Sequence, residues 1–392
     1  MSVWPRRAIR SLISSAAKPK PQSLSAEVWN LNLDQIESHS GRVLEKVHVH
    51  PDKLGPSTFA FEPNTVLYSK LRPYLNKVVV ANEPGFATTE LVPIRCNSDE
   101  VLPEYLAFYL RSQEFLSFAT ATVAGAKMPR MVMNDFWEFQ VPLPPLPEQR
   151  RIAAILDQAD ALRAKRREAL AQLDSLTQSI FIEMFGDPAT NSKAWPRLTM
   201  NELTDDQGPQ NGLYKPSTDY GTGTPILRID AFYDGVVTKL DSLKRVRLSA
   251  SELSLYGLRP EDIVINRVNS IEYLGKSALI PKLNEDTVFE SNMMRFAVRR
   301  DVVEPRYVVQ FLQTAFIKSQ IMSCSKNAVN QSSINQQDVK SFQVNVPPLL
   351  LQRTFVSRVR SVEALKTTYR SALVELDNLF ASLQHRAFRG DL

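Results

Sequence analysis

Polar and basic side chains gather in a cluster in each half of the chain, and these side chains could bind nucleic acid. Arginine, lysine, asparagine and serine hydrogen-bond base edges or phosphates, and tyrosine can stack on a base. The cluster of the first half, at 69–77, contains Lys70, Arg72, Tyr74, Asn76 and Lys77. Its counterpart at 266–276 contains Asn266, Arg267, Asn269, Ser270, Tyr273 and Lys276. Both follow a run of strand-forming residues, so we expect them on loops.

A second pair of clusters lies further along each half, between an expected short helix and the last expected strand. The loop at 125–130 contains Lys127 and Arg130, and the loop at 327–333 contains Asn330 and Gln331. The second half adds Lys215 and Ser217 in a turn-rich loop. Solvated loops are the simpler interpretation of any single cluster, but recurrence in both halves favours binding. The sequence therefore favours a nucleic-acid-binding surface in each half.

Signatures of catalysis are weak throughout the chain. Gly221-Thr222-Gly223-Thr224 lacks the third glycine of a dinucleotide loop, and neither a Walker-type lysine loop nor an amino-methyltransferase Pro-Pro motif occurs. His48 and His50 have no further His or Cys nearby, so an exposed strand pair is favoured over a metal site. We expect no catalytic residues, no cofactor and no metal ion in this chain.

Composition indicates a multidomain globular protein. The 392 residues are 43% hydrophobic and carry a formal net charge of +5, too mild for a nonspecific nucleic-acid coat. If the chain binds nucleic acid, its basic residues must therefore be concentrated locally. Two distant cysteines, Cys96 and Cys324, favour a reducing compartment. No apolar run approaches the roughly 20 residues of a membrane span, and the start of the chain lacks a secretory core. We expect a soluble, cytoplasmic protein without membrane contact.

The two halves repeat each other at a spacing of about 203 residues, most clearly in a long helix. Each half begins with Trp-Pro-Arg, at Trp4 and Trp195. A Pro-Pro pair followed by Gln-Arg opens each helical stretch, at Gln149 and at Gln352. The matches continue without a gap through Leu162/Leu365, Leu170/Leu373, Leu173/Leu376, Asp174/Asp377, Leu176/Leu379 and Phe185/Phe388.

An apolar seam at a spacing of 3.5 residues runs along both expected helices. In the first it includes Ile152, Leu156, Leu170, Leu173 and Ile180, and in the second Phe355, Val359, Val362, Leu373, Leu376 and Leu383. The seam turns polar near its middle, at Arg163, Arg166 and Lys366. Helices of about 37 residues span roughly 55 Å, so each needs a partner for its stripe. An intramolecular antiparallel pair is favoured over two independent helices packed on their own domains.

The globular segments alternate short strands with a helix. Strands are predicted at 65–68, 77–80 and 91–94, with a helix at 103–119, and in the second half at 226–229, 263–265 and 277–280, with a helix at 305–321. The predicted bounds are 1–146 and 188–346 for the two domains, and 147–187 and 347–392 for the helices. The predicted fold is α+β: two mixed α/β domains separated by two long antiparallel helices that form a coiled-coil spacer, with a pseudo-two-fold internal repeat.

The chain resembles the DNA-specificity (S) subunits of type I restriction-modification systems over essentially its whole length. The most specific motifs are Pro144-Pro145-Leu146-Pro147-Glu148-Gln149-Arg150 and Met184-Phe185-Gly186-Asp187-Pro188, and Leu71-Arg72-Pro73-Tyr74-Leu75-Asn76-Lys77 is also similar. The resemblance implies two target recognition domains, each reading half of a split double-stranded DNA sequence. It implies two conserved spacer helices that act as a ruler and dock two methyltransferase subunits.

The resemblance further implies that the partners, not this chain, methylate adenine with S-adenosylmethionine, and that up to two motor-nuclease subunits cleave unmodified DNA in the restriction system. Leu350 and Leu351 replace the Pro-Glu of the first copy, which leaves open whether both copies bind a methyltransferase equally. The alternative from another class is a helical scaffold joining two protein-binding domains without DNA contact. A third, a self-sufficient modification enzyme, is disfavoured by the missing cofactor loops.

Overall fold

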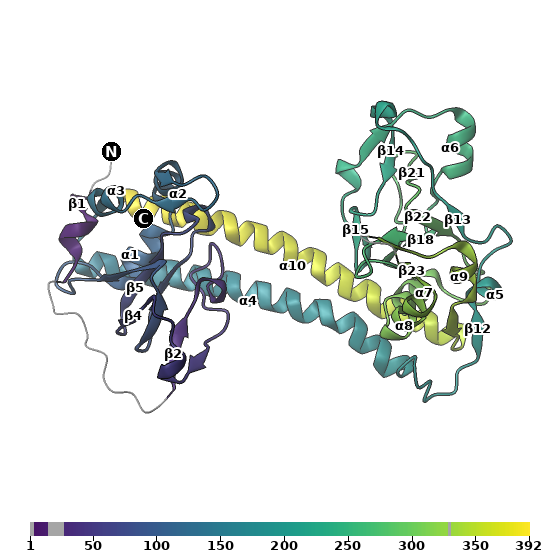
Figure 1. Cartoon of the computed structure of the whole chain (residues 1–392), viewed down its shortest axis with the longest axis horizontal. Coiled ribbons are helices and arrows are strands. Elements are labelled where there is room, and N and C mark those ends of the chain that lie inside the picture. Colours follow the sequence, from purple (N-terminus) through teal and green to yellow (C-terminus); the bar gives the residue numbers. More distant parts are fainter. Residues whose placement is uncertain (1–3, 15–26, 328–330) are drawn as a thin grey trace. The chain divides into compact units, whose positions relative to one another are not determined.

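The structure, a computed structural model, describes residues 4–14, 27–327 and 331–392. It divides into two compact units: unit 1 comprises Met1–Ala169 and Tyr369–Leu392, and unit 2 comprises Leu170–Thr368. The long helices are α4 (Leu146–Phe185) and α10 (Leu349–Arg389), drawn in teal and yellow in Figure 1. Each unit therefore contains one globular domain together with part of each long helix.

The domain of unit 1 has a three-stranded antiparallel sheet, β6–β5–β8, and a four-stranded sheet, β3–β2–β7–β4. Alternate side chains of β5 point to opposite faces and fill different cores: Val66 and Tyr68 pack with the helices, and Leu67 packs with Trp29. This explains why all five residues of β5 are buried. The elements are β2 (Val28–Leu31), β3 (His48–Val49), β4 (Thr58–Phe61), β5 (Thr65–Ser69), β6 (Val78–Val80), β7 (Gly85–Thr88), β8 (Leu91–Arg95), α1 (Pro103–Leu110), α2 (Gln113–Ala121), β9 (Val123–Ala124), β10 (Arg130–Met131) and α3 (Met133–Glu138).

The domain of unit 2 is built on a six-stranded sheet, β13–β22–β18–β20–β16–β15, with two three-stranded sheets, β17–β14–β21 and β19–β24–β23. In β18, Ile263 and Ile265 fill the core that contains the helices, and Val264 fills a second core. The elements are α5 (Met200–Leu203), β13 (Gln210–Asn211), β14 (Tyr220–Leu227), β15 (Phe232–Tyr233), β16 (Gly235–Val237), β17 (Lys244–Val246), α6 (Ala250–Tyr256), β18 (Ile263–Asn266), β19 (Val268–Asn269), β20 (Ser277–Leu279), β21 (Val288–Phe289), β22 (Met293–Phe296), α7 (Pro305–Leu312), α8 (Ala315–Cys324), β23 (Lys326–Asn327), β24 (Ser332–Ser333) and α9 (Gln336–Ser341).

The expectation of one helix at 103–119 and another at 305–321 was wrong, because each is broken in two. Ser112 caps α2 by accepting a hydrogen bond from the Phe115 amide (3.3 Å), and Thr314 caps α8 in the same way through Ile317 (3.5 Å). A side-chain cap satisfies an amide that the first turn of a helix leaves unpaired, which lets the chain start a second helix at an angle. Ser112 and Thr314 are the sequence signal for this break.

Each domain closes on itself where the long helix begins. In unit 1, β1 (Arg6–Ala8) pairs with β11 (Gln140–Pro142), and the Leu143 amide donates to the Pro5 carbonyl (2.8 Å). In unit 2, β12 (Arg197–Thr199) pairs with β25 (Gln343–Asn345), and the Val346 amide donates to the Pro196 carbonyl (2.8 Å). The start of each repeat is thus held against its end, which confirms the internal repeat.

The two long helices run antiparallel within each unit, and each unit contains a charged contact at the equivalent place. In unit 1, Arg163 of α4 binds Asp377 of α10 (2.7 Å) and also binds Asp160 one turn earlier (2.9 Å). In unit 2, Lys366 of α10 binds Asp174 of α4 (3.1 Å) and Glu363 one turn earlier (3.3 Å). The polar middle of the seam is therefore a pair of matching ion networks. The predicted helix pair is confirmed.

The helices also pack on the domains. The apolar stripe of each helix therefore contacts both the other helix and a globular domain, so the two arrangements expected from the sequence occur together. In unit 1, Ile152 and Leu156 of α4 join the core with Ala387 and Phe388 of α10. In unit 2, Phe181 of α4 joins the core with the opening turns of α10, including Phe355 and Val359. The other predicted seam residues are buried or half-buried: Leu170, Leu173, Ile180, Val362, Leu373, Leu376 and Leu383. Gly186, at φ 78°, ends α4.

A buried glutamine joins each domain to the start of its helix. The side-chain amide group of Gln149 donates through Nε2 to the carbonyls of Pro144 and Glu100 (both 2.8 Å). Its Oε1 accepts from the backbone amide of Leu102 (2.9 Å). Gln352 makes the same three kinds of bond in unit 2, including one to the Pro347 carbonyl (2.7 Å). The repeated Gln-Arg motif is thus a structural joint that satisfies backbone groups around the Pro-Pro turn.

Replacing Gln149 by leucine should destabilise unit 1, because three buried backbone groups lose their partner at about 1–3 kcal/mol for each unsatisfied group. The measurement is hydrogen exchange of the Leu102 amide together with the thermal unfolding midpoint. Arg150→Leu, at the neighbouring exposed position, is the matched control. Equal protection in Gln149→Leu and wild type would contradict this role.

Candidate nucleic-acid interface

The structure brings the two predicted clusters of unit 1 together. The Lys70 carbonyl accepts from the Met131 amide (2.8 Å), and the Arg72 amide donates to the Pro129 carbonyl (2.7 Å). Arg72 and Asn76 both adopt the left-handed conformation, at φ 50° and 48°, and flank a 3₁₀ turn at Pro73–Leu75. This tight turn leaves Arg72 and Tyr74 exposed, with Lys127 exposed on the neighbouring loop. These loops form one continuous surface, and Lys70 lies half-buried at its edge.

Unit 2 repeats this arrangement with different side chains. The Ile334 amide donates to the Arg267 carbonyl (2.9 Å), and β19 pairs with β24, so that Asn269 faces Ser332. Ser270 and Tyr273 are exposed on the loop that follows, and Gln331 is exposed before β24. The predicted residue Asn330 lies outside the described residues. Two loops far apart in the sequence again form one surface.

Four of the predicted residues brace the loops from inside. The Asn76 amide group donates to the Arg111 carbonyl (3.0 Å), and Asn266 is fully buried in β18 with its amide 3.5 Å from the Tyr273 carbonyl. Lys77 donates to the Leu33 carbonyl and Lys276 to the Ile229 carbonyl, each at 2.6 Å. Burial lowers the pKa of both lysines. The matching lysines therefore tie each loop to the preceding part of its domain.

Three predicted cations are held by partners within their own unit. Arg130 forms a two-pronged ion pair with Glu90 (2.9 Å at the shortest), which lowers the pKa of that carboxyl. Lys215 binds Glu252 (2.8 Å), and this hydrogen bond lowers the pKa of Glu252 to about 2. Arg267 donates to the Ser291 carbonyl (3.1 Å). Their charge is partly used within the fold, whereas Ser217 beside Lys215 remains exposed.

Sequence reasoning did not select Tyr214, which is 77% exposed next to Lys215. Its place in the turn-rich loop beside Lys215 was the sequence signal for its exposure. The strand β17 presents Lys244 and Arg245 to solvent, and Arg245 is ion-paired with Glu285 (2.6 Å).

The described part of the chain shows no group of three or more side chains arranged to hold a metal ion. His48 lies beside Glu83 (3.5 Å) and His50 beside Asp52 (3.1 Å), so the two imidazoles contact different carboxylates. Burial raises the pKa of the Cys96 thiol to about 12, which disfavours a nucleophilic thiolate. Within residues 4–14, 27–327 and 331–392, no helix has the length and apolar character to cross a membrane.

The chain is similar to known proteins in both sequence and structure. Residues 57–172 match the family model described as the type I restriction modification DNA specificity domain. Over 306 residues the chain is 27% identical to the EcoKI specificity subunit of Escherichia coli K12, covering 74% of this chain and 65% of that subunit. The chain is thus similar to the DNA-specificity subunits of type I restriction enzymes. The StySPI specificity subunit of Salmonella potsdam is 25% identical over 308 residues, covering 74% of this chain and 66% of its own length.

The matched part of the chain spans just under two thirds of the length of these two specificity subunits. Solved structures share the fold over nearly the whole chain. A chain from a type I restriction-modification system, described for its complex assembly, superposes with a TM-score of 0.62 at 21% identity, covering 99% of this chain and 98% of that one. The S subunit from M. genitalium gives a TM-score of 0.57 at 16% identity, with 99% and 96% covered.

Substitution by methionine can distinguish the exposed residues of the first cluster from those that brace the loop from inside. Lys77→Met should lower stability by about 1 kcal/mol, because the hydrogen bond to the Leu33 carbonyl is lost. Arg72→Met should leave stability within about 0.5 kcal/mol and weaken binding to a DNA target by about 1–3 kcal/mol. Unfolding midpoints and titrations with duplex DNA measure the two effects. Equal loss of DNA binding in both variants at unchanged stability would show that Lys77 also contacts DNA.

Proposed function

We propose that this chain is a non-catalytic, sequence-specific DNA-binding subunit of a type I restriction-modification complex. It reads a bipartite DNA target and docks methyltransferase subunits that methylate adenine, and with a motor-nuclease subunit the complex restricts unmodified DNA. The observation that carries this proposal is the repeat itself: each unit has its own pair of exposed loops and its own share of both helices. Two similar reading surfaces in one chain suit a target made of two half-sites.

The loop residues that suit DNA contact are those left exposed. In unit 1 they are Arg72, Tyr74 and Lys127, with Lys70 half-buried beside them, and in unit 2 they are Ser270, Tyr273, Gln331 and the loop around Ser217, with Asn269 half-buried beside them. Unit 1 is the more basic of the two surfaces and suits phosphate and guanine contacts, whereas unit 2 offers amide and hydroxyl groups that suit adenine and backbone oxygens. We therefore expect the two half-sites to differ in sequence.

The helices suit the role of a spacer. At 40 and 41 residues, α4 and α10 would each extend roughly 60 Å, comparable to between one and two turns of DNA at about 34–36 Å each. We place the domain bounds at 1–146 and 188–346, with spacer helices at 147–187 and 347–392, because β11 ends at Pro142 and β25 at Asn345. The separation of the half-sites would follow from the helix length.

Exposed leucines on the helices suit the docking of partner subunits. In unit 1, Leu162 of α4 is 54% exposed and Leu379 of α10 is 49% exposed; in unit 2, the equivalent Leu365 and Leu176 are 40% and 38% exposed. The two leucines of unit 1 are the repeat equivalents of the two leucines of unit 2. We propose that the two leucines of each unit form one apolar patch, and two equivalent patches favour two methyltransferase subunits. Leu350, 78% exposed on α10 where the first copy has Pro147, makes the second docking surface different.

The complex would modify chromosomal DNA, and we therefore place it in the cytoplasm. A scaffold that joins two protein-binding domains without touching DNA is the competing function. Purification with the partner subunits, followed by footprinting on a duplex that contains the methylated sites of the host genome, separates the two. Two protected segments flanking an unprotected gap are expected, whereas a scaffold protects no DNA.

Leu162→Glu should release one methyltransferase subunit, because a carboxylate in an apolar contact loses its hydration without a partner. Mass measurement of the purified complex should show one subunit fewer, with the unfolding midpoint of the isolated chain unchanged. Ala161→Glu adds the same charge at the neighbouring exposed residue and should retain both subunits. Full retention by Leu162→Glu would exclude this patch as a docking surface.

A further inference from the structure

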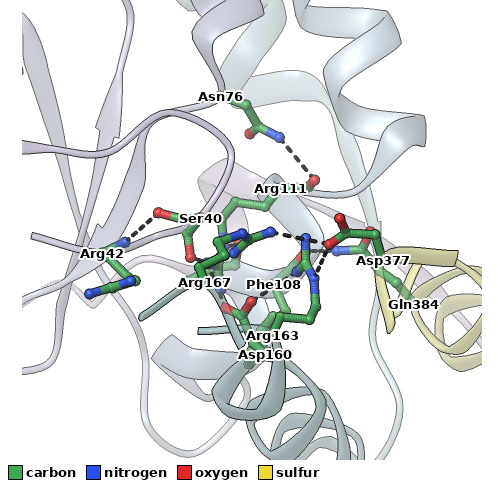
Figure 2. A network of polar contacts seen from close by, with 11 residues as sticks. Ser40, Arg42, Asn76, Phe108, Arg111, Asp160, Arg163, Arg167, Asp377 and Gln384 are labelled. Carbon is green, nitrogen blue, oxygen red and sulfur yellow. Dashed lines mark hydrogen bonds and ion pairs between the residues drawn. The ribbon is translucent and has the colours of Figure 1, made fainter. Parts of the chain in front are cut away.

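A largely buried arginine connects each recognition domain to an acid on its long helix. In unit 1, Arg111 at the end of α1 lies 3.7 Å from Asp160 of α4 and donates to the Ser40 carbonyl, as Figure 2 shows. Its side chain is 11% exposed. Gly41 is left-handed, at φ 72°, and a side chain there would collide with the guanidinium. The turn at Ser40–Gly41 is therefore shaped around this arginine.

Unit 2 makes the same connection with an arginine from a different position. Arg306, in the first turn of α7, lies 3.7 Å from Glu363 of α10 and donates to the Gly235 carbonyl (3.4 Å). Gly235 is again left-handed, at φ 78°. Asp160 and Glu363 occupy equivalent positions of the repeat, whereas the residue that matches Arg111 is Gln313. The sequence thus keeps the connection in both units although the arginine has moved.

These acids belong to the ion networks between the helices. Asp160 also binds Arg163, which binds Asp377 of the opposite helix, and Glu363 also binds Lys366, which binds Asp174. Each arginine therefore contacts, through one acid, the network that pairs the helices. In unit 1, Asp160 lies about 21 Å along α4 from Leu146, beyond Gln149, Ile152 and Leu156. A contact so far from the joint resists tilting better than one beside it.

The Arg111 network also reaches the recognition loop. The Arg111 carbonyl accepts from the Asn76 amide group, and the His39 amide donates to the Asn76 carbonyl (3.3 Å). The loop that presents Arg72 and Tyr74 is therefore hydrogen-bonded, through Asn76, to Arg111, which contacts the helix. We propose that Arg111 and Arg306 are positioning residues that fix the angle of each recognition domain on its helix pair, and so restrict the gap length that a bipartite target can have. This inference rests on the proposed function.

The test uses the complete complex with its methyltransferase subunits. Methylation kcat/KM is measured on duplexes that keep both half-sites but carry the preferred gap, or one base pair more or fewer. A second series keeps the gap and changes single bases of each half-site. Arg111→Met and Arg306→Met should each reduce discrimination against the wrong gap by about tenfold or more, because a misplacement of about 1 Å can change a rate by up to about a hundredfold. Discrimination between bases should stay as in wild type.

Arg42→Met is the matched control, because Arg42 lies in the same domain with an exposed side chain, and it should retain the wild-type gap preference. Arg111→Lys keeps the charge and should restore part of the preference. Wild-type gap preference in both methionine variants would overturn the proposal, and so would a parallel loss of base discrimination, which would indicate a disordered loop. If the Arg111→Met chain fails to assemble with the methyltransferase subunits, the gap preference of the Arg306→Met complex tests the proposal. A wild-type complex indifferent to the gap would instead refute the proposed function.

Discussion

The structure depends on a cation held between carboxylates of two antiparallel helices, once in each unit. Side chains of Arg163 and Lys366 are 12% and 8% exposed, and a charge so withdrawn from water is tolerated only beside a partner. Sliding one helix along the other by one heptad, about 10 Å, would remove Asp377 from Arg163 and Asp174 from Lys366. The pairs therefore select a single register, a role that polar groups in an apolar seam are known to play. The apolar residues stabilise the contact between the helices, and the ion pairs specify their register.

Other repeated features follow from this alignment. Each domain is fastened to a helix start by a buried glutamine, and an aromatic core continues onto the facing helix, as where Tyr109 meets Phe388 with ring centroids 4.9 Å apart. The exposed loops of the two units differ from these shared features. Their hydrogen-bonding geometry is the same in both units, but the side chains that they expose are different.

The sequence predicted those parts of the fold that are periodic or repeated. Both long helices, the strands around Val66 and Val264 and the stop at Gly186 follow from local pattern and from the matching of halves. The break at Ser112 was missed because an apolar stripe continues across it, although the cap was visible. The partners of Arg163 could not be read from the chain, since several acids lie within helical reach. Loop residues were the least predictable: Asn76 and Lys77 have the chemistry of base contacts, and only the folded chain turns them towards backbone carbonyls. Arg306 illustrates the same limit. It does not align with Arg111 when the two halves are compared, so the repeat could not show that the two arginines have the same role.

The central claim, that the helix pair sets the separation of two DNA half-sites, is tested most directly by shortening it. Removing residues 166–172 and 369–375 takes seven residues, about two turns, from each helix and preserves the register of the ion networks on either side. The pair becomes shorter by about 10 Å, or about three base pairs. Sequencing of methylated sites in a host that carries the shortened chain should show both half-sites unchanged and their gap reduced by about three base pairs. An unchanged gap in an active complex would contradict the account.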